Sequence, residues 1–175
     1  MKKILIFLFL LLGVSGCGAD NTPKAEVQKL FSNYNNLSSD LLIQLDAVME
    51  SENLTDEQIL KYKDVLKRQY KDLKYKINEE IINNDSAIVS VDIEVYNLIN
   101  AIDEAEKYLK NNKNEFYNGE TQNNEKIWNY KLDKMLETNE KINYTIDFSL
   151  TNLDGKWTLD ELLETDREKI HGLYK

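Results

Sequence analysis

The run Ile142-Asn143-Tyr144-Thr145-Ile146-Asp147-Phe148-Ser149-Leu150-Thr151 is the clearest strand signal in the chain. Apolar and polar side chains alternate along it without a break, so a strand here would turn one face to a core and the other to solvent. Residues 152–155 end in Asp-Gly, a pair typical of tight hairpin turns, and residues 156–159 begin a return strand. This stretch predicts an antiparallel hairpin with one buried face.

A second hairpin is predicted upstream. The runs 73–81 and 87–95 alternate in the same way and flank the polar cluster 83–86. Glu79 interrupts the first run, because its parity places it with the apolar residues Tyr75, Ile77 and Ile81. Two explanations remain open: Glu79 lies at a strand end or bulge, or it enters a cavity as a pocket carboxylate.

Apolar residues recur at steps of three and four in the other regions, which is typical of helices with one buried face. They predict helices over 24–50 (broken near 35–38), 56–72, 99–116 and 122–138, with the polar segment 110–126 as the least constrained part. The tail 160–175 is acidic and then basic. Helices, hairpin, helices, hairpin is the order of an α+β domain, in which helices pack on one face of an antiparallel sheet.

The first residues have the layout of a secretory signal. Two lysines precede nine apolar residues, 4–12, and small residues lead to the chain's only cysteine, Cys17. Nine residues of helix rise about 14 Å, less than half of a hydrocarbon core about 30 Å thick, so this is too short to span a membrane. An ordinary secretory signal with an incidental cysteine is one interpretation of this layout.

Val14-Ser15-Gly16-Cys17 resembles the lipobox of bacterial lipoproteins. The resemblance implies that Cys17 receives a diacylglyceryl group and becomes the acylated first residue of the mature chain. Two acyl chains suffice for stable membrane attachment. We therefore expect a signal peptide over 1–16, a lipid-anchored tether over 17–23 and a single α+β domain over 24–175, on the extracytoplasmic face of the cell membrane.

The charge restricts the partners. The formal net charge is −9, and because the leader holds two lysines, the remaining chain carries −11. Proteins that bind nucleic acid need a basic surface, so we expect no nucleic-acid partner. The same charge disfavours lying flat on an anionic lipid surface. The excess of lysine over arginine suggests an AT-rich coding sequence, as in low-GC Gram-positive bacteria.

No familiar catalytic or metal set can be assembled from these residues. The single histidine, His171, lies near the C-terminal end, where we expect a surface or capping role. Without it there is no Ser-His-Asp set and no histidine zinc site. Asn152, Asp154, Gly155 and Glu161 match positions of a calcium loop, but its first position would be the apolar Leu150. We predict a hairpin turn there, no metal and no cofactor.

Aromatic residues are the remaining candidates for a binding site. Tyr75, Tyr96, Tyr144 and Trp157 fall where sheet and helices should meet, either as core or as the lining of a pocket for an apolar or sugar-like ligand. With Glu79 they form the predicted possible pocket. Three functions are compatible with these features: a lipid-anchored module that binds a small apolar ligand or docks an envelope protein, an enzyme that uses Glu79 as its base, or a structural surface lipoprotein without a pocket.

The pattern also resembles the cystatin-like, nuclear-transport-factor-2-like superfold, in which a curved sheet wraps helices. More closely, the chain is similar to an uncharacterised family of clostridial-type lipoproteins. The motifs that carry this resemblance are structural: Leu73-Lys74-Tyr75-Lys76-Ile77, the run Ala87 to Tyr96, Asp154-Gly155-Lys156-Trp157 and His171-Gly172-Leu173-Tyr174. The segment 99–141 between the hairpins departs from the common form of the superfold. Fold alone does not imply an activity.

Overall fold

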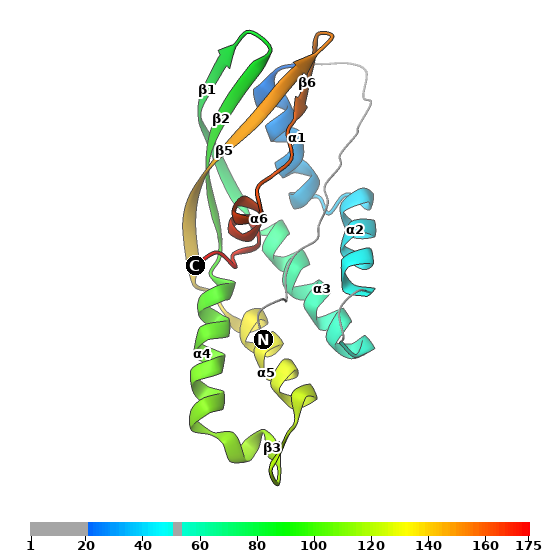
Figure 1. Cartoon of the computed structure of the whole chain (residues 1–175), viewed down its shortest axis with the longest axis vertical. Helices are drawn as coiled ribbons and strands as arrows, with labels where there is room; N and C mark the ends of the chain where they lie inside the picture. The colour runs from blue at the N-terminus through cyan, green and yellow to red at the C-terminus, as the bar shows by residue number, and fades with distance from the viewer. Residues whose placement is uncertain (1–20, 51–53) are drawn as a thin grey trace.

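The computed structural model of the chain describes residues 21–50 and 54–175. The predicted signal peptide, Cys17 and the tether as far as residue 20 lie outside the described residues. The described chain forms these elements: α1 (Pro23–Asn35), α2 (Ser39–Glu50), α3 (Asp56–Lys71), β1 (Lys74–Asn83), β2 (Ser86–Tyr96), α4 (Leu98–Asn111), η1 (Lys113–Glu115), β3 (Tyr117–Asn118), β4 (Thr121–Gln122), α5 (Asn124–Glu137), β5 (Lys141–Leu153), β6 (Lys156–Leu159) and α6 (Glu164–His171). The turns of the main sheet lie at one end of the long axis, and the α4–α5 pair lies at the other (Figure 1).

The two predicted hairpins join in one antiparallel sheet of order β1-β2-β5-β6. They join because β2 pairs with β5 along its whole length, from Ser86 opposite Thr151 to Tyr96 opposite Lys141. The alternation seen in the sequence becomes one buried face, as the apolar residues of both strands are almost fully covered: Val89, Val91, Ile93, Val95, Ile146, Phe148 and Leu150. The α+β class is therefore confirmed. The short strands β3 and β4 form a separate two-stranded sheet.

A β-bulge explains the odd parity of Glu79. The register of β1 against β2 shifts between Ile77, which faces Val91, and Glu79, which faces Ser90. The extra residue leaves Glu79 exposed and turns Glu80 toward the helices. There the Glu80 carboxylate accepts a hydrogen bond of 2.8 Å from the backbone amide of Lys24, in the first turn of α1. Two explanations for Glu79 were open, a strand end or bulge and a pocket carboxylate, and the structure contains the bulge.

The long N-terminal helix is divided in two. Leu37 adopts a positive φ of 48° in the turn between α1 and α2. This turn falls within 35–38, where the sequence predicts a break. The side-chain amide of Asn35 holds this corner by donating 2.9 Å hydrogen bonds to the carbonyls of Tyr70 and Leu73. Helix α1 lies against the sheet, where Phe31 stacks on Tyr75 at 4.4 Å between ring centroids.

The C-terminal segment is part of the core, which the sequence did not predict. Residues 164–171 form α6, which packs on β2, and Ile170 and Leu173 are buried. Gly172 ends the helix with a φ of 69°, and its carbonyl accepts a 2.9 Å hydrogen bond from the amide of Ile99 in α4. The segment therefore connects the sheet to the first turn of α4.

The expected surface or capping role of His171 is wrong. Its side chain is only 5% exposed, and its Nδ1 shares a 3.0 Å hydrogen bond with the hydroxyl of Tyr70 in α3. Gln69 precedes Tyr70 in α3, and its side-chain Oε1 accepts a 2.9 Å hydrogen bond from the backbone amide of Tyr96. We call Gln69, Tyr70, Tyr96, His171 and Gly172 the C-terminal joint.

Candidate functional site

The aromatic residues predicted as a possible pocket are packing residues. Tyr75 stacks on Phe31, and Trp157 is 8% exposed. The hydroxyl of Tyr96 donates to Asp72 at 2.7 Å, and the hydroxyl of Tyr144 donates to the carbonyl of Tyr174 at 2.9 Å. Tyr96 and Tyr144 therefore pack their rings and use their hydroxyls in hydrogen bonds.

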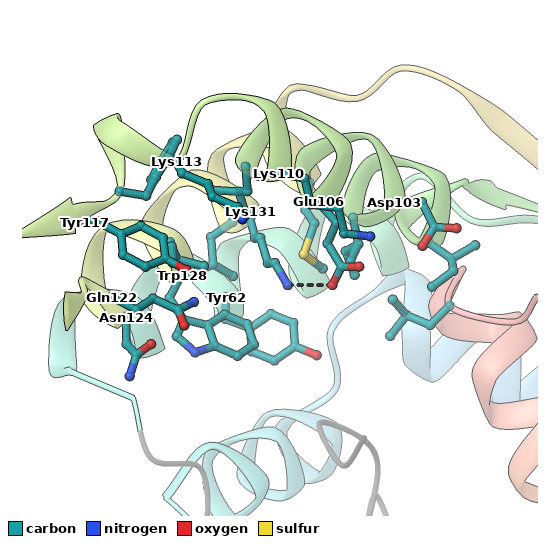
Figure 2. A pocket seen from close by; sticks show the side chains of 18 of the residues that line it. Tyr62, Asp103, Glu106, Lys110, Lys113, Tyr117, Gln122, Asn124, Trp128 and Lys131 are labelled. Carbon is teal, nitrogen blue, oxygen red and sulfur yellow. Dashed lines mark hydrogen bonds and ion pairs between the residues drawn. The ribbon is translucent and has the colours of Figure 1, made fainter. Parts of the chain in front are cut away.

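A cavity of about 530 Å³ lies elsewhere, between α4 and α5. None of Glu79, Tyr75, Tyr96, Tyr144 and Trp157 lines it. The walls come from the two helices, η1, the β3–β4 hairpin, Tyr62 of α3 and the C-terminal residues Leu173 and Lys175. Figure 2 shows Tyr117, Gln122 and Asn124 toward one end of the cavity and Asp103 toward the other. Its volume falls within the range of ordinary small-molecule sites.

Helix α4 supplies apolar side chains that the core covers only in part. The buried positions of α4 are Leu98, Ala101 and Ala105. The larger side chains of Ile99, Ile102 and Leu109 are only partly buried, and all three line the cavity. Beyond Leu98 the buried positions are alanines, and these three bulky residues line the cavity.

Helix α5 supplies the opposite wall and is fixed from behind by α3. Trp128 is half-buried on the cavity wall. The ammonium of Lys61 bonds Asp133 at 2.7 Å, and the side-chain amide of Gln58 donates to the carbonyl of Glu125 at 3.1 Å. Arg68 donates to the carbonyl of Leu136 at 2.7 Å, near the end of α5 where carbonyls lack helical partners.

An aromatic cluster braces the far end of the two helices. Tyr108 of α4 stacks on Tyr130 of α5 with ring centroids 5.1 Å apart, and Phe116 meets Tyr130 edge-on at 5.3 Å. The amide of Asn123 donates to the carbonyl of Phe116 at 2.9 Å and closes the β3–β4 loop. The elements that form the walls of the cavity are therefore held by contacts outside it.

Lysines dominate the charges of the cavity lining. Four lysines and two carboxylates line it, although the chain as a whole is acidic. Lys131 pairs with Glu106 at 2.8 Å, as drawn in Figure 2, and Lys175 pairs with Asp103 at 2.9 Å. The hydrogen bond from Lys175 to Asp103 raises the pKa of Lys175. Lys110 and Lys113 form no ion pair with any other residue in 21–50 or 54–175.

Polar side chains are also buried in and beside the C-terminal joint, away from the cavity. Burial lowers the pKa of His171 to about 4, and the positive charge of Arg167 acts in the same direction. Burial also raises the pKa values of Tyr34 and Tyr70, whose rings lie 4.9 Å apart between centroids. All three groups are therefore neutral at pH 7, and the joint is held by neutral hydrogen bonds and packing.

Sequence reasoning missed the cavity because it placed the possible pocket between the sheet and the helices, at Tyr75, Tyr96, Tyr144 and Trp157. The sequence also predicts that the polar segment 110–126 is the least constrained part of the domain. In the structure this segment supplies Phe116, Tyr117 and Gln122 to the cavity lining. The available signal was two successive helices with bulky apolar residues, Ile99 and Ile102 on one and Ile127 and Trp128 on the other.

Comparisons with known proteins gave no relative to assist this assignment: no family model, no curated protein and no solved structure matches the chain. Among the described residues, no group of three or more histidine, cysteine or acidic side chains is arranged to hold a metal ion. No helix within 21–50 or 54–175 combines the length and apolar character needed to cross a membrane.

Proposed function

We propose that this protein is a lipid-anchored, extracytoplasmic binding protein whose α4–α5 cavity takes a small ligand with an apolar body and an anionic group. The observation that carries the proposal is the cavity itself. Its apolar walls, from Ile99 and Ile102 on one side to Ile127 and Trp128 on the other, would exclude water from an alkyl or aromatic body.

The charge of the ligand is inferred from the lysines. Lys131 and Lys175 are already paired with carboxylates, so they add little net positive charge to the cavity. Lys110 and Lys113 bring two further positive charges to the lining. Both are exposed, so each would add at most about 1 kcal/mol to the binding of a carboxylate or phosphate. The apolar contacts therefore supply the affinity, and the lysines select the sign of the head group.

The lipid anchor is the second part of the proposal and rests on the resemblance of Val14-Ser15-Gly16-Cys17 to a lipobox. The cystatin-like resemblance likewise remains a proposal. What supports it is helix α1 packed on one face of a four-stranded antiparallel sheet. Mass spectrometry of the protein extracted from membranes would test the anchor directly. A mature chain that begins at Cys17 and carries a diacylglyceryl mass is the expected result.

The two other functions inferred from the sequence have less support. An enzyme with Glu79 as its base needs that carboxylate in a cavity, whereas Glu79 is exposed at the bulge of β1 and does not line the α4–α5 cavity. A structural lipoprotein without a pocket does not account for bulky apolar residues arranged around a hollow of about 530 Å³.

Calorimetric titration with dodecanoate tests the binding proposal, using protein made without residues 1–17. We expect one site per chain and weaker or no binding of dodecyltrimethylammonium, which has the same alkyl chain with a cationic head. Ile127→Trp would occupy part of the cavity and should weaken binding. Ile43→Trp, at a position that is 66% exposed on α2, is the matched control and should bind as the parent does. Equal binding by all three proteins would reject the cavity as the site.

A further inference from the structure

Four exposed apolar side chains lie near the turns of the main sheet, on both faces of the strands. Ile81, Ile82, Ile88 and Leu153 are 53%, 54%, 47% and 64% exposed. Ile81 pairs with Ile88 near the β1–β2 turn, and Leu153 is the last residue of β5. Ile82 pairs with the buried Ala87, so it lies on the other face of the same hairpin end. The two turns are joined by a 2.7 Å hydrogen bond from the amide of Asn152 to the carbonyl of Asp85. We call these four residues the hairpin-end patch.

The tether reaches the domain at the same end of the sheet. The side chain of Asn21 donates to the carbonyl of Gly155, in the β5–β6 turn, and accepts a 3.0 Å hydrogen bond from the amide of Trp157. Asn21 lies only four positions after Cys17 in the sequence, so the two residues can be at most about 14 Å apart. An acyl group on Cys17 would therefore hold the β5–β6 turn close to the lipid surface.

We propose that the hairpin-end patch docks on the outer surface of the bilayer that holds the lipid anchor. This inference rests on the proposed anchoring at Cys17. The patch would place isoleucine and leucine side chains in the interfacial layer, where apolar groups gain from leaving water. The α4–α5 cavity would then lie at the end of the molecule away from the membrane (Figure 1).

The charges around the patch favour apolar insertion over electrostatic attraction. The two turns carry Asp85 and Asp154, with Lys156 as the nearest basic residue in the sequence of the second turn. A polybasic surface that would attract anionic lipid is therefore missing from these turns. Docking should accordingly occur on neutral phosphatidylcholine and should change little with salt.

The anchor leaves no other cysteine in the chain, which permits a site-specific probe. We would introduce Ile88→Cys into the full lipidated protein, attach a polarity-sensitive fluorophore and reconstitute the protein into phosphatidylcholine vesicles. Ile43→Cys, labelled in the same way, is the matched control because it is also exposed and apolar but lies on α2. Lipids that carry a spin label at a shallow depth then report contact by quenching.

We expect the probe at position 88 to be quenched at least about twofold more than the probe at position 43, with a blue-shifted emission. Added Ile81→Thr and Leu153→Thr substitutions should reduce this difference. Equal quenching at both positions in protein of verified lipid mass would overturn the docking and leave the anchor and the cavity standing. A blue shift without lipid quenching would indicate self-association and would also overturn it. A mature chain without the lipid mass would overturn both the anchor and the docking.

Discussion

The two ends of the molecule both present apolar side chains, but they arrange them in opposite ways. At the hairpin end, Ile81 and Ile88 lie side by side on a strand pair, near a turn, with about half of each side chain in solvent. At the other end, Ile102 and Trp128 face a hollow between two helices. Apolar groups on a projecting turn can meet only a surface, whereas apolar groups around a hollow can enclose a ligand. Shape therefore separates the two roles where composition does not.

Substitution of Gly172 should have the largest effect, because it would disrupt the C-terminal joint between the two ends. A Cβ at this position would lie 2.0 Å from the carbonyl oxygen of Tyr96 and 2.6 Å from Nε2 of Gln69. We expect Gly172→Ala to lower the free energy of unfolding by about 4 kcal/mol or more. Urea unfolding followed by circular dichroism measures this loss.

Gly119→Ala is the matched control for that experiment. Gly119 also has a positive φ, 66°, but nothing lies within 4 Å of a Cβ placed there. Its substitution should cost only the backbone strain, about 1 kcal/mol. Equal losses for the two variants would show that the joint does not hold the two ends together by close packing.

Acid should weaken the same joint. The pKa of His171 is lowered to about 4 by burial, whereas an unfolded histidine has a pKa near 6.5. Between these values the unfolded state binds the proton and the folded state does not, so stability is lost as the pH falls. We expect a loss of about 2 kcal/mol between pH 7.5 and pH 5 from this residue. Urea unfolding at both pH values tests it. His171→Gln should remove this part of the pH dependence, and an unchanged dependence would contradict the account.

Charge reversal at the cavity should affect ligand binding alone. We expect Lys110→Glu with Lys113→Glu to weaken dodecanoate binding about tenfold, or about 1.4 kcal/mol, with no loss of stability. Lys107→Glu with Lys156→Glu makes the same change in net charge at exposed positions outside the lining. If the control pair weakens binding equally, the protein's overall charge, not the two lining lysines, governs the affinity.

Polar substitution of the hairpin-end patch should have the smallest effect on the isolated protein. Ile81→Thr, Ile88→Thr and Leu153→Thr together should change the free energy of unfolding by less than about 1 kcal/mol and leave dodecanoate binding unchanged. Ile146→Thr, in the same sheet but 1% exposed, should cost about 2–3 kcal/mol. A large loss of stability from the three exposed changes would mean that the patch is part of the core.

The sequence predicts elements whose signals are local. Strands β2 and β5 follow from alternation, and α3 follows from its stripe and its capping box at Thr55. The bulge at Glu79 is decided by pairing across strands, so parity alone leaves two explanations open. Helix α6 lacks a clear apolar stripe. Ile170 and the following Leu173 are buried because the segment packs against β2 and α3, which are distant in the sequence.

The candidate site was less predictable than the fold. The residues chosen for a pocket, Tyr75 and Trp157 among them, are apolar because they pack, and sequence gives no measure of whether a neighbour fills the space beside them. The cavity depends on the distance between α4 and α5, which is set by α3, the aromatic cluster and the C-terminal joint. Such spacing is a property of the assembled fold and leaves no periodic signal.

The two tryptophans offer the most direct test, because one lies at each end. Trp128 lines the cavity, and Trp157 lies in β6, beside the hairpin turns. We would label the tryptophan indoles with ¹⁵N, assign them with Trp157→Phe, and add a fatty acid that carries a spin label. We predict that the Trp128 resonance broadens while the Trp157 resonance stays sharp. Broadening of Trp157 alone, or of neither resonance, would contradict a ligand site between α4 and α5.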